Sequence, residues 1–218
     1  WGNIGLCGCV LLAAWPYMKV LGTVNQELIK EFVLPFCNCD DGSITGCWAV
    51  TEPDHGSDTL NVGEKFFKDS KIKGQIQSRL DGDEYVLNGQ KMWISNAGFA
   101  EIFIVFARIE DDKNITGFLL EYDKENPNGV TFGEEEKKLG ITSSSTRQVF
   151  FNDTKIPVEN MLSERGKGFK IAMNSLNVGR IKLAAACIDA SRRIVTESVH
   201  YANERIQFKR PISSFGAI

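Results

Sequence analysis

Residues 51–58 read Thr-Glu-Pro-Asp-His-Gly-Ser-Asp. Pro53 fixes φ and Gly56 permits a positive φ, so a sharp turn is expected between these two positions. Such a turn exposes backbone N–H groups beside the hydroxyls of Thr51 and Ser57, which together form a concavity suited to a phosphate or to the polar edge of a ring. A dinucleotide cofactor offers both of these groups.

A second segment, residues 91–96, reads Lys-Met-Trp-Ile-Ser-Asn. On a strand, the two-residue spacing of Trp93 and Ser95 places an indole and a hydroxyl on one face. The indole can stack on a ring and the hydroxyl can form a hydrogen bond. Either segment alone is also ordinary loop or strand chemistry.

Composition and charge exclude several classes of protein. The chain has 218 residues and 43% hydrophobic content, enough for one large domain or two modest ones. A net charge of -3 with scattered Lys and Arg disfavours a nucleic-acid partner. The apolar run at residues 4–17 is too short to span a bilayer and lacks a basic n-region, so membrane association is not indicated.

The six cysteines include two close pairs, Cys7-x-Cys9 and Cys37-x-Cys39. Structural zinc sites usually separate paired ligands by two or more residues, and the first pair lies in an apolar stretch. We therefore expect no metal site, and we expect buried free thiols in a reducing compartment, either cytoplasmic or mitochondrial matrix.

The order of patterns along the chain is helix, β block, helix. Helical spacing of apolar residues marks residues 24–36, and Asp40-Asp41-Gly42 breaks it. Short β-branched and aromatic runs from residue 43 to 162 are typical of an antiparallel barrel or sandwich. Turns are expected at Asp81-Gly82 and at Pro127-Asn128-Gly129.

The last part of the chain, after Gly166-Lys167-Gly168, returns to helical spacing. The pattern predicts one long helix, with a possible local adjustment at Gly179. Its buried stripe is expected to contain Phe169, Ala172, Leu176, Ile181, Ala184, Ala185, Ile188, Ile194 and Val199. These boundaries predict an α+β chain with segments at 1–42, 43–162 and 163–218.

Residues 51–58 and 91–96 resemble the flavin-facing segments of acyl-CoA dehydrogenases, and their joint occurrence has the order and spacing of that family. The resemblance covers nearly all of the chain, with further matches at residues 129–131, 136–141, 149–151, 156–160 and 166–169. The very-long-chain branch looks closest, through residues 176–180 and 207–208. The implied fold has an N-terminal helical part, a central antiparallel β-barrel domain and the start of a C-terminal helical domain.

The resemblance implies roles for individual residues around an FAD cofactor. Trp48, Val50 and Thr51 would hold the flavin ring through backbone and hydroxyl bonds, and Ser57 would lie near the pyrophosphate and the CoA. Trp93 would pack against the isoalloxazine. Ser95 stands where the family usually has Thr, whose hydroxyl bonds flavin N5, and Ser keeps that hydroxyl but loses a methyl group.

Four residues near the end of the chain also match the family. Arg205 and Phe208 would reach the FAD of a neighbouring subunit, where a guanidinium suits a pyrophosphate. Asn177 and Arg180 would lie near the CoA and the active site. The resemblance thus implies a homodimer or homotetramer.

The implied reaction removes an α-proton from an acyl-CoA thioester while a β-hydride passes to the flavin, giving a trans-2-enoyl-CoA. An electron-transfer flavoprotein or a similar acceptor would reoxidise the cofactor. The family's glutamate base is expected beyond Ile218, because its alternative position in the family is occupied here by Gly179. We therefore expect an internal segment of a longer enzyme, without a catalytic residue of its own.

Two other hypotheses remain open at this point. The missing base is compatible with a non-catalytic scaffold that binds acyl-CoA or FAD. The flavin-facing segments also look like those of acyl-CoA oxidases and nitroalkane oxidases, which share the fold. Turnover with an electron acceptor excludes the scaffold, and oxygen consumption separates an oxidase from a dehydrogenase.

Overall fold

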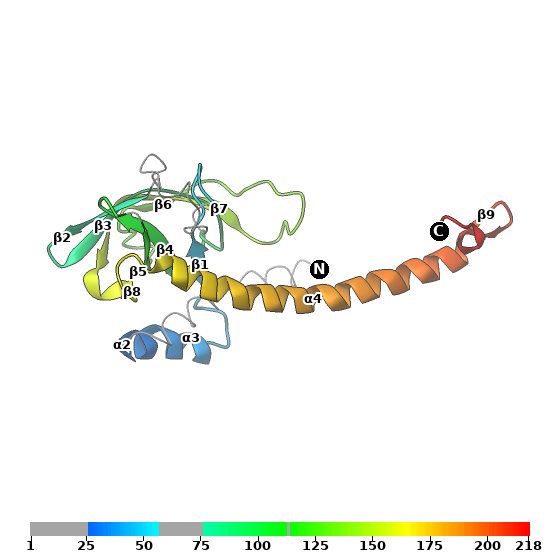
Figure 1. The fold of residues 1–218 in the computed structure, drawn as a ribbon, viewed down its shortest axis with the longest axis horizontal. Coiled ribbons are helices and arrows are strands. Elements are labelled where there is room, and N and C mark those ends of the chain that lie inside the picture. Colours follow the sequence, from blue (N-terminus) through cyan, green and yellow to red (C-terminus); the bar gives the residue numbers. More distant parts are fainter. Residues whose placement is uncertain (1–25, 57–75, 113) are drawn as a thin grey trace. The chain divides into compact units, whose positions relative to one another are not determined.

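A computed structural model describes residues 26–56, 76–112 and 114–218, and Figure 1 shows its ribbon. The chain divides into two compact units, Trp1–Leu176 and Asn177–Ile218. The first unit contains the sheet and the candidate site. The first cysteine pair, Cys7-x-Cys9, lies outside the described residues.

The N-terminal helical segment consists of α2 (Gln26–Leu28), a π-helical stretch (Ile29–Val33) and α3 (Leu34–Asn38). Leu28 and Phe32 are 4% and 6% exposed, as expected for apolar residues one helical turn apart. The helical prediction for residues 26–36 is therefore confirmed. The predicted break follows α3, where Asp41 accepts a hydrogen bond from the backbone N–H of Ser43.

Eight strands form one sheet in the order β6-β7-β3-β2-β4-β5-β8, with β1 paired to β4. Their bounds are β1 Gly46–Ala49, β2 Gln77–Asp81, β3 Glu84–Ser95, β4 Ile102–Ile109, β5 Ile115–Glu121, β6 Val130–Phe132, β7 Thr146–Pro157 and β8 Met161–Leu162. The strands lie side by side in Figure 1. Most pairings are antiparallel, as predicted.

Two pairings differ from the antiparallel prediction, because β1 and β2 both run parallel to β4. The sheet is therefore mixed. Turn signals in a sequence mark only antiparallel neighbours, which a tight hairpin can join, whereas parallel strands are joined by longer connections. The sequence patterns carried no signal for these two parallel contacts.

Both predicted turns are confirmed. Gly82 has φ 62° between β2 and β3, whose last and first residues, Asp81 and Glu84, are paired. Before β6, the N–H of Val130 donates to the carbonyl of Pro127 at 2.8 Å. Gly129 in that second turn has φ 73°, a conformation that glycine adopts without steric cost.

Both faces of the sheet are buried around β4. Its residues alternate between two apolar clusters: Phe103, Val105 and Ala107 belong to one, and Ile102, Ile104 and Phe106 to the other. The second cluster also contains Leu28 and Phe32 from the N-terminal helical segment. A strand covered on both faces needs a continuous apolar run, which explains the sequence Ile-Phe-Ile-Val-Phe at residues 102–106.

The long helix α4 (Gly168–Glu204) begins in the first unit. Before it, Arg165 forms an ion pair with Asp112 at 2.7 Å, and the N–H of Gly166 donates to the hydroxyl of Thr116 at 2.8 Å. A Cβ on Gly168 would lie 2.7 Å from the carbonyl oxygen of Ile115, so only glycine fits this close approach. These contacts hold the start of α4 against the β4–β5 hairpin.

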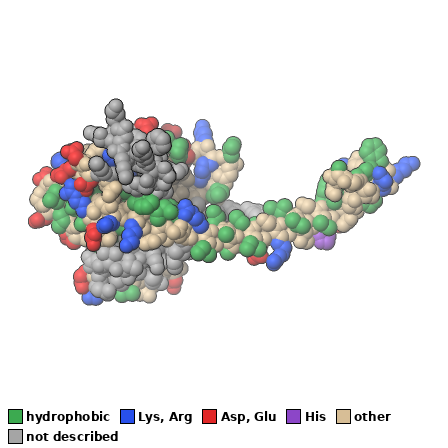
Figure 2. Space-filling model, in the orientation of Figure 1, with side chains coloured by type: hydrophobic (Ala, Val, Ile, Leu, Met, Phe, Trp, Pro, Cys, Tyr) green, Lys and Arg blue, Asp and Glu red, His purple; other side chains and the backbone are tan. Residues whose placement is uncertain are grey.

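The second unit contains the rest of α4, β9 (Ile206–Gln207), β10 (Arg210–Pro211) and a 3-10 turn (Ile212–Ser214). The predicted buried stripe is wrong here, because Ile181, Ile188 and Val199 are 72%, 61% and 54% exposed. Figure 2 shows hydrophobic side chains along this part of the helix. The unit consists of one helix and one short hairpin, which cannot cover a helix face of this length.

The described residues contain neither a membrane-spanning helix nor a cluster of candidate metal ligands. None of the helices in this part of the chain is long and apolar enough to cross a bilayer. Among the same residues, no group of three or more His, Cys, Asp and Glu side chains is placed to hold a metal ion.

Candidate functional site

The segments that contain Thr51 and Trp93 lie side by side and are joined by hydrogen bonds. The backbone N–H of Met92 donates to the carbonyl of Thr51 at 2.8 Å. The ammonium of Lys91 donates to the carbonyl of Val50 at 2.8 Å. Two motifs about forty residues apart in sequence thus meet within the first unit.

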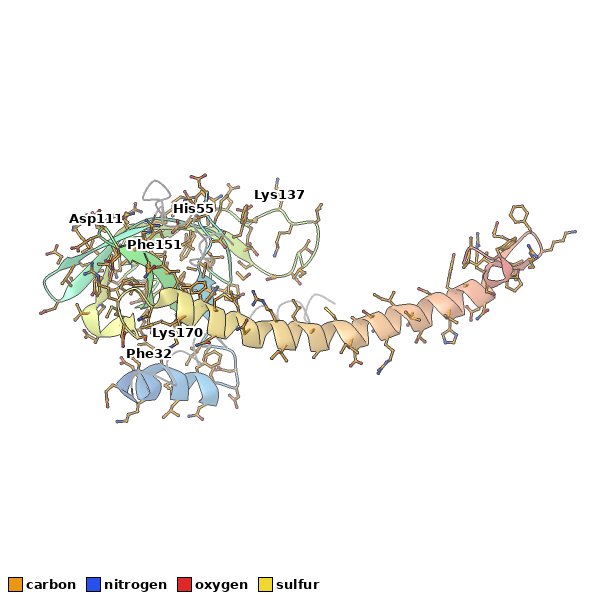
Figure 3. All side chains as sticks on the ribbon, viewed as in Figure 1. Phe32, His55, Asp111, Lys137, Phe151 and Lys170 are labelled. Atoms are coloured by element: carbon orange, nitrogen blue, oxygen red, sulfur yellow. The ribbon has the colours of Figure 1, made fainter. Side chains whose placement is uncertain are left out.

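The loop that follows β1 turns sharply, as Pro53 predicts, but Gly56 does not adopt the positive φ that glycine permits. The N–H of Glu52 donates to the carbonyl of His55 at 2.7 Å, which closes the turn. Figure 3 labels His55 on this loop and Phe151 in the sheet. Ser57, the predicted contact of the pyrophosphate, lies outside the described residues.

Glu52 and Lys91 form a buried ion pair between the two segments. The Lys91 ammonium lies 3.0 Å from Oε1 of Glu52, and the two side chains are 2% and 5% exposed. The same Glu52 oxygen accepts the backbone N–H of Ile76 at 3.4 Å. Burial lowers the pKa of Lys91 from its usual 10.5, although the nearby Glu52 carboxylate acts in the opposite direction.

Trp93 stands on an irregularity of β3. The pairing of β3 with β7 shifts register between Lys91 and Ile94, and Trp93 there has φ 57°. The indole is 57% exposed, whereas the neighbouring Ile94 is only 2% exposed and belongs to the core. A bulky side chain at positive φ is rare, and strain of this kind is concentrated at functional sites.

Two further predicted residues of this unit are Ser95 and Trp48, and Asn96 follows Ser95 directly after β3. Ser95 is half-buried and pairs with Thr146 of β7. Trp48 is half-buried in β1, and its ring centroid lies 4.7 Å from that of Phe106 in an edge contact. Asn96 is buried, and its side-chain amide donates to the carbonyl of Gly46 at 3.4 Å.

Four predicted residues lie in the second unit. A guanidinium nitrogen of Arg180 donates to the side-chain oxygen of Asn177 at 2.7 Å, and this hydrogen bond is exposed. Phe208 is 88% exposed with φ 51°, and its ring centroid lies 6.1 Å from that of Phe215. The carbonyl of Arg205 accepts the N–H of Ile212 at 2.9 Å. Gly179 is half-buried within α4, which is α-helical throughout.

Sequence reasoning missed the ion pair of Glu52 and Lys91, although both residues stand within the two quoted segments. The signal was present in their charges, because each segment carries one ionisable residue that the sheet buries. Buried Lys and Glu are almost always paired. A search for opposite charges in two segments expected to meet would have found them.

An eight-stranded sheet that is preceded and followed by helices, with Trp93 exposed at a register shift, places the chain in the α+β class. The comparison with known families is more specific. The acyl-CoA dehydrogenase middle domain matches residues 47–154, and the acyl-CoA dehydrogenase C-terminal domain matches residues 166–218. The chain belongs to the acyl-CoA dehydrogenase family and has its α+β fold.

Two curated relatives illustrate the similarity. A probable acyl-CoA dehydrogenase of Bacillus subtilis is 44% identical over 191 residues, which are 88% of this chain and 30% of that protein. The mitochondrial very long-chain specific acyl-CoA dehydrogenase of Macaca fascicularis is 40% identical over 91% of this chain and 29% of its own length. The chain thus spans less than a third of either relative.

Solved structures agree with this assignment. An acyl-CoA dehydrogenase of Bacillus anthracis, complexed with FAD, has a TM-score of 0.79 and 37% identity and covers 98% of this chain and 34% of its own. The butyryl-CoA dehydrogenase of Megasphaera elsdenii has a TM-score of 0.80 and 32% identity over 99% of this chain and 52% of its own. A prolyl acyl carrier protein oxidase, AnaB, has a TM-score of 0.82 and 25% identity, over 99% of this chain and 53% of its own.

Proposed function

We propose that the protein is an FAD-dependent acyl-CoA dehydrogenase, in which these residues supply the flavin-binding part and a portion of the CoA site. One observation carries the proposal: the segment with the exposed, strained Trp93 and the hydroxyl of Ser95 is tied by buried bonds to Val50 and Thr51. Family membership and the relatives' printed names support the same activity.

The side chains of this site fit the shape and chemistry of an isoalloxazine ring. That ring has a flat apolar face and a polar edge, and the site presents an exposed indole beside two half-buried hydroxyl residues, Thr51 and Ser95. The carbonyls of Val50 and Thr51 are already engaged by Lys91 and Met92. These two carbonyls hold the protein's own segments together, so the polar contacts proposed for Val50 and Thr51 use their N–H groups and the Thr51 hydroxyl.

Each predicted residue keeps its assigned role within the proposal. Trp93 packs on the flavin ring, and Ser95 bonds its N5 edge. Trp48, Val50 and Thr51 hold the ring through backbone and hydroxyl bonds. Ser57 contacts the pyrophosphate and the CoA. Asn177 and Arg180, already hydrogen-bonded to each other, lie toward the CoA.

The proposal extends to assembly and to the electron acceptor. Arg205 and Phe208 contact the FAD of a neighbouring subunit in a homodimer or homotetramer. The 88% exposure of Phe208 leaves its ring available for such a contact. The proposed acceptor is an electron-transfer flavoprotein, and a solved chain described under the electron transferring flavoprotein of Acidaminococcus fermentans has a TM-score of 0.79 and 30% identity to this one.

Bound FAD would supply a hydride acceptor at N5. The chain's own residues orient the ring through Trp93 and Ser95 and exclude water with the apolar cluster that contains Val50 and Phe106. The alcohol side chain at residue 95 donates a hydrogen bond at the ring edge where charge develops during transfer.

The direct test mixes the purified native protein, loaded with FAD, with acyl-CoA thioesters of increasing chain length in the absence of oxygen. We expect loss of the oxidised flavin absorbance together with formation of the trans-2-enoyl-CoA. A protein that binds FAD and CoA but reduces no flavin with any thioester is a scaffold, and this outcome contradicts the proposed activity.

An oxidase on the same fold is the second candidate, favoured by the similarity to the prolyl acyl carrier protein oxidase. The two activities differ in the reoxidation of the reduced flavin. If the native protein is a dehydrogenase, turnover in air consumes oxygen far more slowly than it reduces an electron-transfer flavoprotein. Oxygen uptake equal to product formation identifies the oxidase instead.

A further inference from the structure

Stability alone does not explain why the ion pair of Glu52 and Lys91 is buried between the two site segments. Lys91 is 1% exposed and is among the largest fully buried side chains of the described residues. Burying an ion pair costs about as much desolvation free energy as the attraction returns, and apolar replacements of similar volume are often as stable. The lowered pKa of Lys91 reflects this desolvation cost. An apolar pair of similar volume would therefore serve stability about as well.

The geometry of the pair ties successive residues of one segment to successive residues of the other. Lys91 contacts the carbonyl of Val50 at 2.8 Å and the carboxylate of Glu52 at 3.0 Å. Between these two contacts, the N–H of Met92 bonds the carbonyl of Thr51 at 2.8 Å. A shift of one residue in either segment would break these contacts together.

Trp93 follows immediately after these ties, at the register shift of β3. Because the backbone there leaves the regular ladder, the ladder alone does not determine where the indole stands. The bonds of Lys91 and Met92 to residues 50–52 constrain the position of this backbone instead. The same carboxylate also accepts the N–H of Ile76, so it holds the chain on both sides of the segment between residues 52 and 76.

We propose that Glu52 and Lys91 are positioning residues of the flavin site, which set the register and spacing of Val50 and Thr51 against Trp93 and Ser95. The inference rests on the proposed function, because it assigns the pair a role in holding FAD. Neither side chain needs to touch the cofactor. Buried polar pairs that specify register, at little gain in stability, are known in other folds.

The test variant is Glu52→Gln with Lys91→Met in the full chain. It removes both charges with nearly unchanged volume, whereas a single substitution would leave a buried charge without its partner. The amide oxygen introduced at position 52 can still accept the N–H of Ile76. The matched control is Glu84→Gln with Lys155→Met, which removes an exposed ion pair of 2.9 Å between the neighbouring strands β3 and β7.

Three measurements separate positioning from stability: the thermal unfolding midpoint, the FAD dissociation constant, and the hydrogen exchange rate of the Met92 amide without FAD. For the test variant we expect a midpoint within about 4 °C of the wild type. We expect FAD affinity to fall roughly tenfold or more, and Met92 exchange to accelerate, because misplaced binding groups lose their alignment. The control should match the wild type in all three.

The outcomes distinguish this inference from the proposed function. A wild-type chain that binds no FAD overturns the proposed function and the inference with it. Wild-type FAD affinity in the folded test variant overturns the inference alone. If the test variant does not fold, Glu52→Asp keeps the charge but withdraws the carboxylate by one methylene, and we expect a severalfold loss of FAD affinity. Undiminished affinity, or unfolding of this variant as well, overturns the inference.

Discussion

At the scale of single residues, Trp93 occupies an unusual position in the described chain. Its φ of 57° is unusual for a bulky side chain, and its indole is 57% exposed. Strain of this kind costs about 1–3 kcal/mol and persists only where the surrounding structure imposes it. Here the buried Ile94 and Lys91 on either side hold the backbone in place. The conformation therefore presents the indole and contributes little to packing.

Replacement of Trp93 by Asn should separate binding from stability. Asn tolerates positive φ, so we expect the unfolding free energy to stay within about 1 kcal/mol of the wild type. FAD affinity should fall about tenfold or more, because stacking on an aromatic side chain is worth about 1–3 kcal/mol. Fluorescence titration with FAD and chemical denaturation measure the two effects.

Leu80→Asn is the matched control for this variant, because Leu80 is a large apolar residue of the same sheet with 50% exposure. It should leave FAD affinity unchanged. If Trp93→Asn lowers the unfolding free energy by more than about 2 kcal/mol, the indole contributes to packing, in conflict with its exposure.

At the scale of secondary-structure elements, the turns decide where the strands begin. Gly129 precedes β6 with φ 73°, and a Cβ there would lie 2.0 Å from the carbonyl oxygen of Asn152. The N–H of Asn152 in turn donates to the carbonyl of Gly129 at 3.0 Å. The glycine is required both by its φ and by the close approach of β7.

Gly129→Ala should therefore destabilise the chain by about 2 kcal/mol or more, since both φ and space oppose a side chain. Gly140→Ala is the control, because an added Cβ there meets nothing within 4 Å. This control should change the unfolding free energy by no more than about 0.5 kcal/mol. Urea denaturation of both variants checks the difference, and equal midpoints would contradict this account of the turn.

The turn between α3 and β1 gives a prediction for pH. Hydrogen bonds from the hydroxyl and the N–H of Ser43, with a weaker one from Cys39, hold the pKa of Asp41 at about 2, below its usual 3.8. A carboxyl with a lowered folded pKa contributes stability above its unfolded pKa, and loses this contribution as pH falls through the folded value. The loss should thus occur between about pH 4 and pH 2.

An NMR titration of the Asp41 carboxyl measures this pKa directly in the folded chain. Asp41→Asn provides the control, because it should remove Asp41's share of the stability change between about pH 4 and pH 2. A midpoint near the usual value of 3.8 would show that the Ser43 hydrogen bonds do not persist in solution.

At the scale of the whole molecule, α4 carries more of the exposed large hydrophobic side chains than any other described element. Ile181 and Ile188 lie seven residues apart on α4 and are 72% and 61% exposed. Residues at this spacing fall on one side of a helix. The proposed homo-oligomer would cover such a surface.

We expect sedimentation velocity to show a dimer or larger species, and Ile181→Glu with Ile188→Glu to shift it toward the monomer, because burying two charges in an apolar contact is costly. The control, Ala186→Glu with Ala190→Glu, adds the same charge on the side of α4 opposite to Ile188 and should leave the assembly intact. A wild-type chain that sediments as a monomer would contradict the proposed assembly.

Local patterns in the sequence were sufficient for much of this protein. The helical spacing before residue 36, the turns at Gly82 and Gly129, and the strand at residues 102–106 follow from backbone preferences and apolar periodicity, which depend on near neighbours in the chain. The two site segments were likewise visible as motifs, and they led to the family that the comparisons support.

Contacts between distant segments were decided only by the tertiary structure. The parallel pairings of β4, the exposure of Trp93 at a shifted register, and the buried pair of Glu52 and Lys91 all depend on which segments meet across the sheet. The physical reason is that periodicity states which face of an element is apolar, but not which element covers it. For the same reason, the stripe that includes Ile181 reads as buried in sequence and is exposed in this chain.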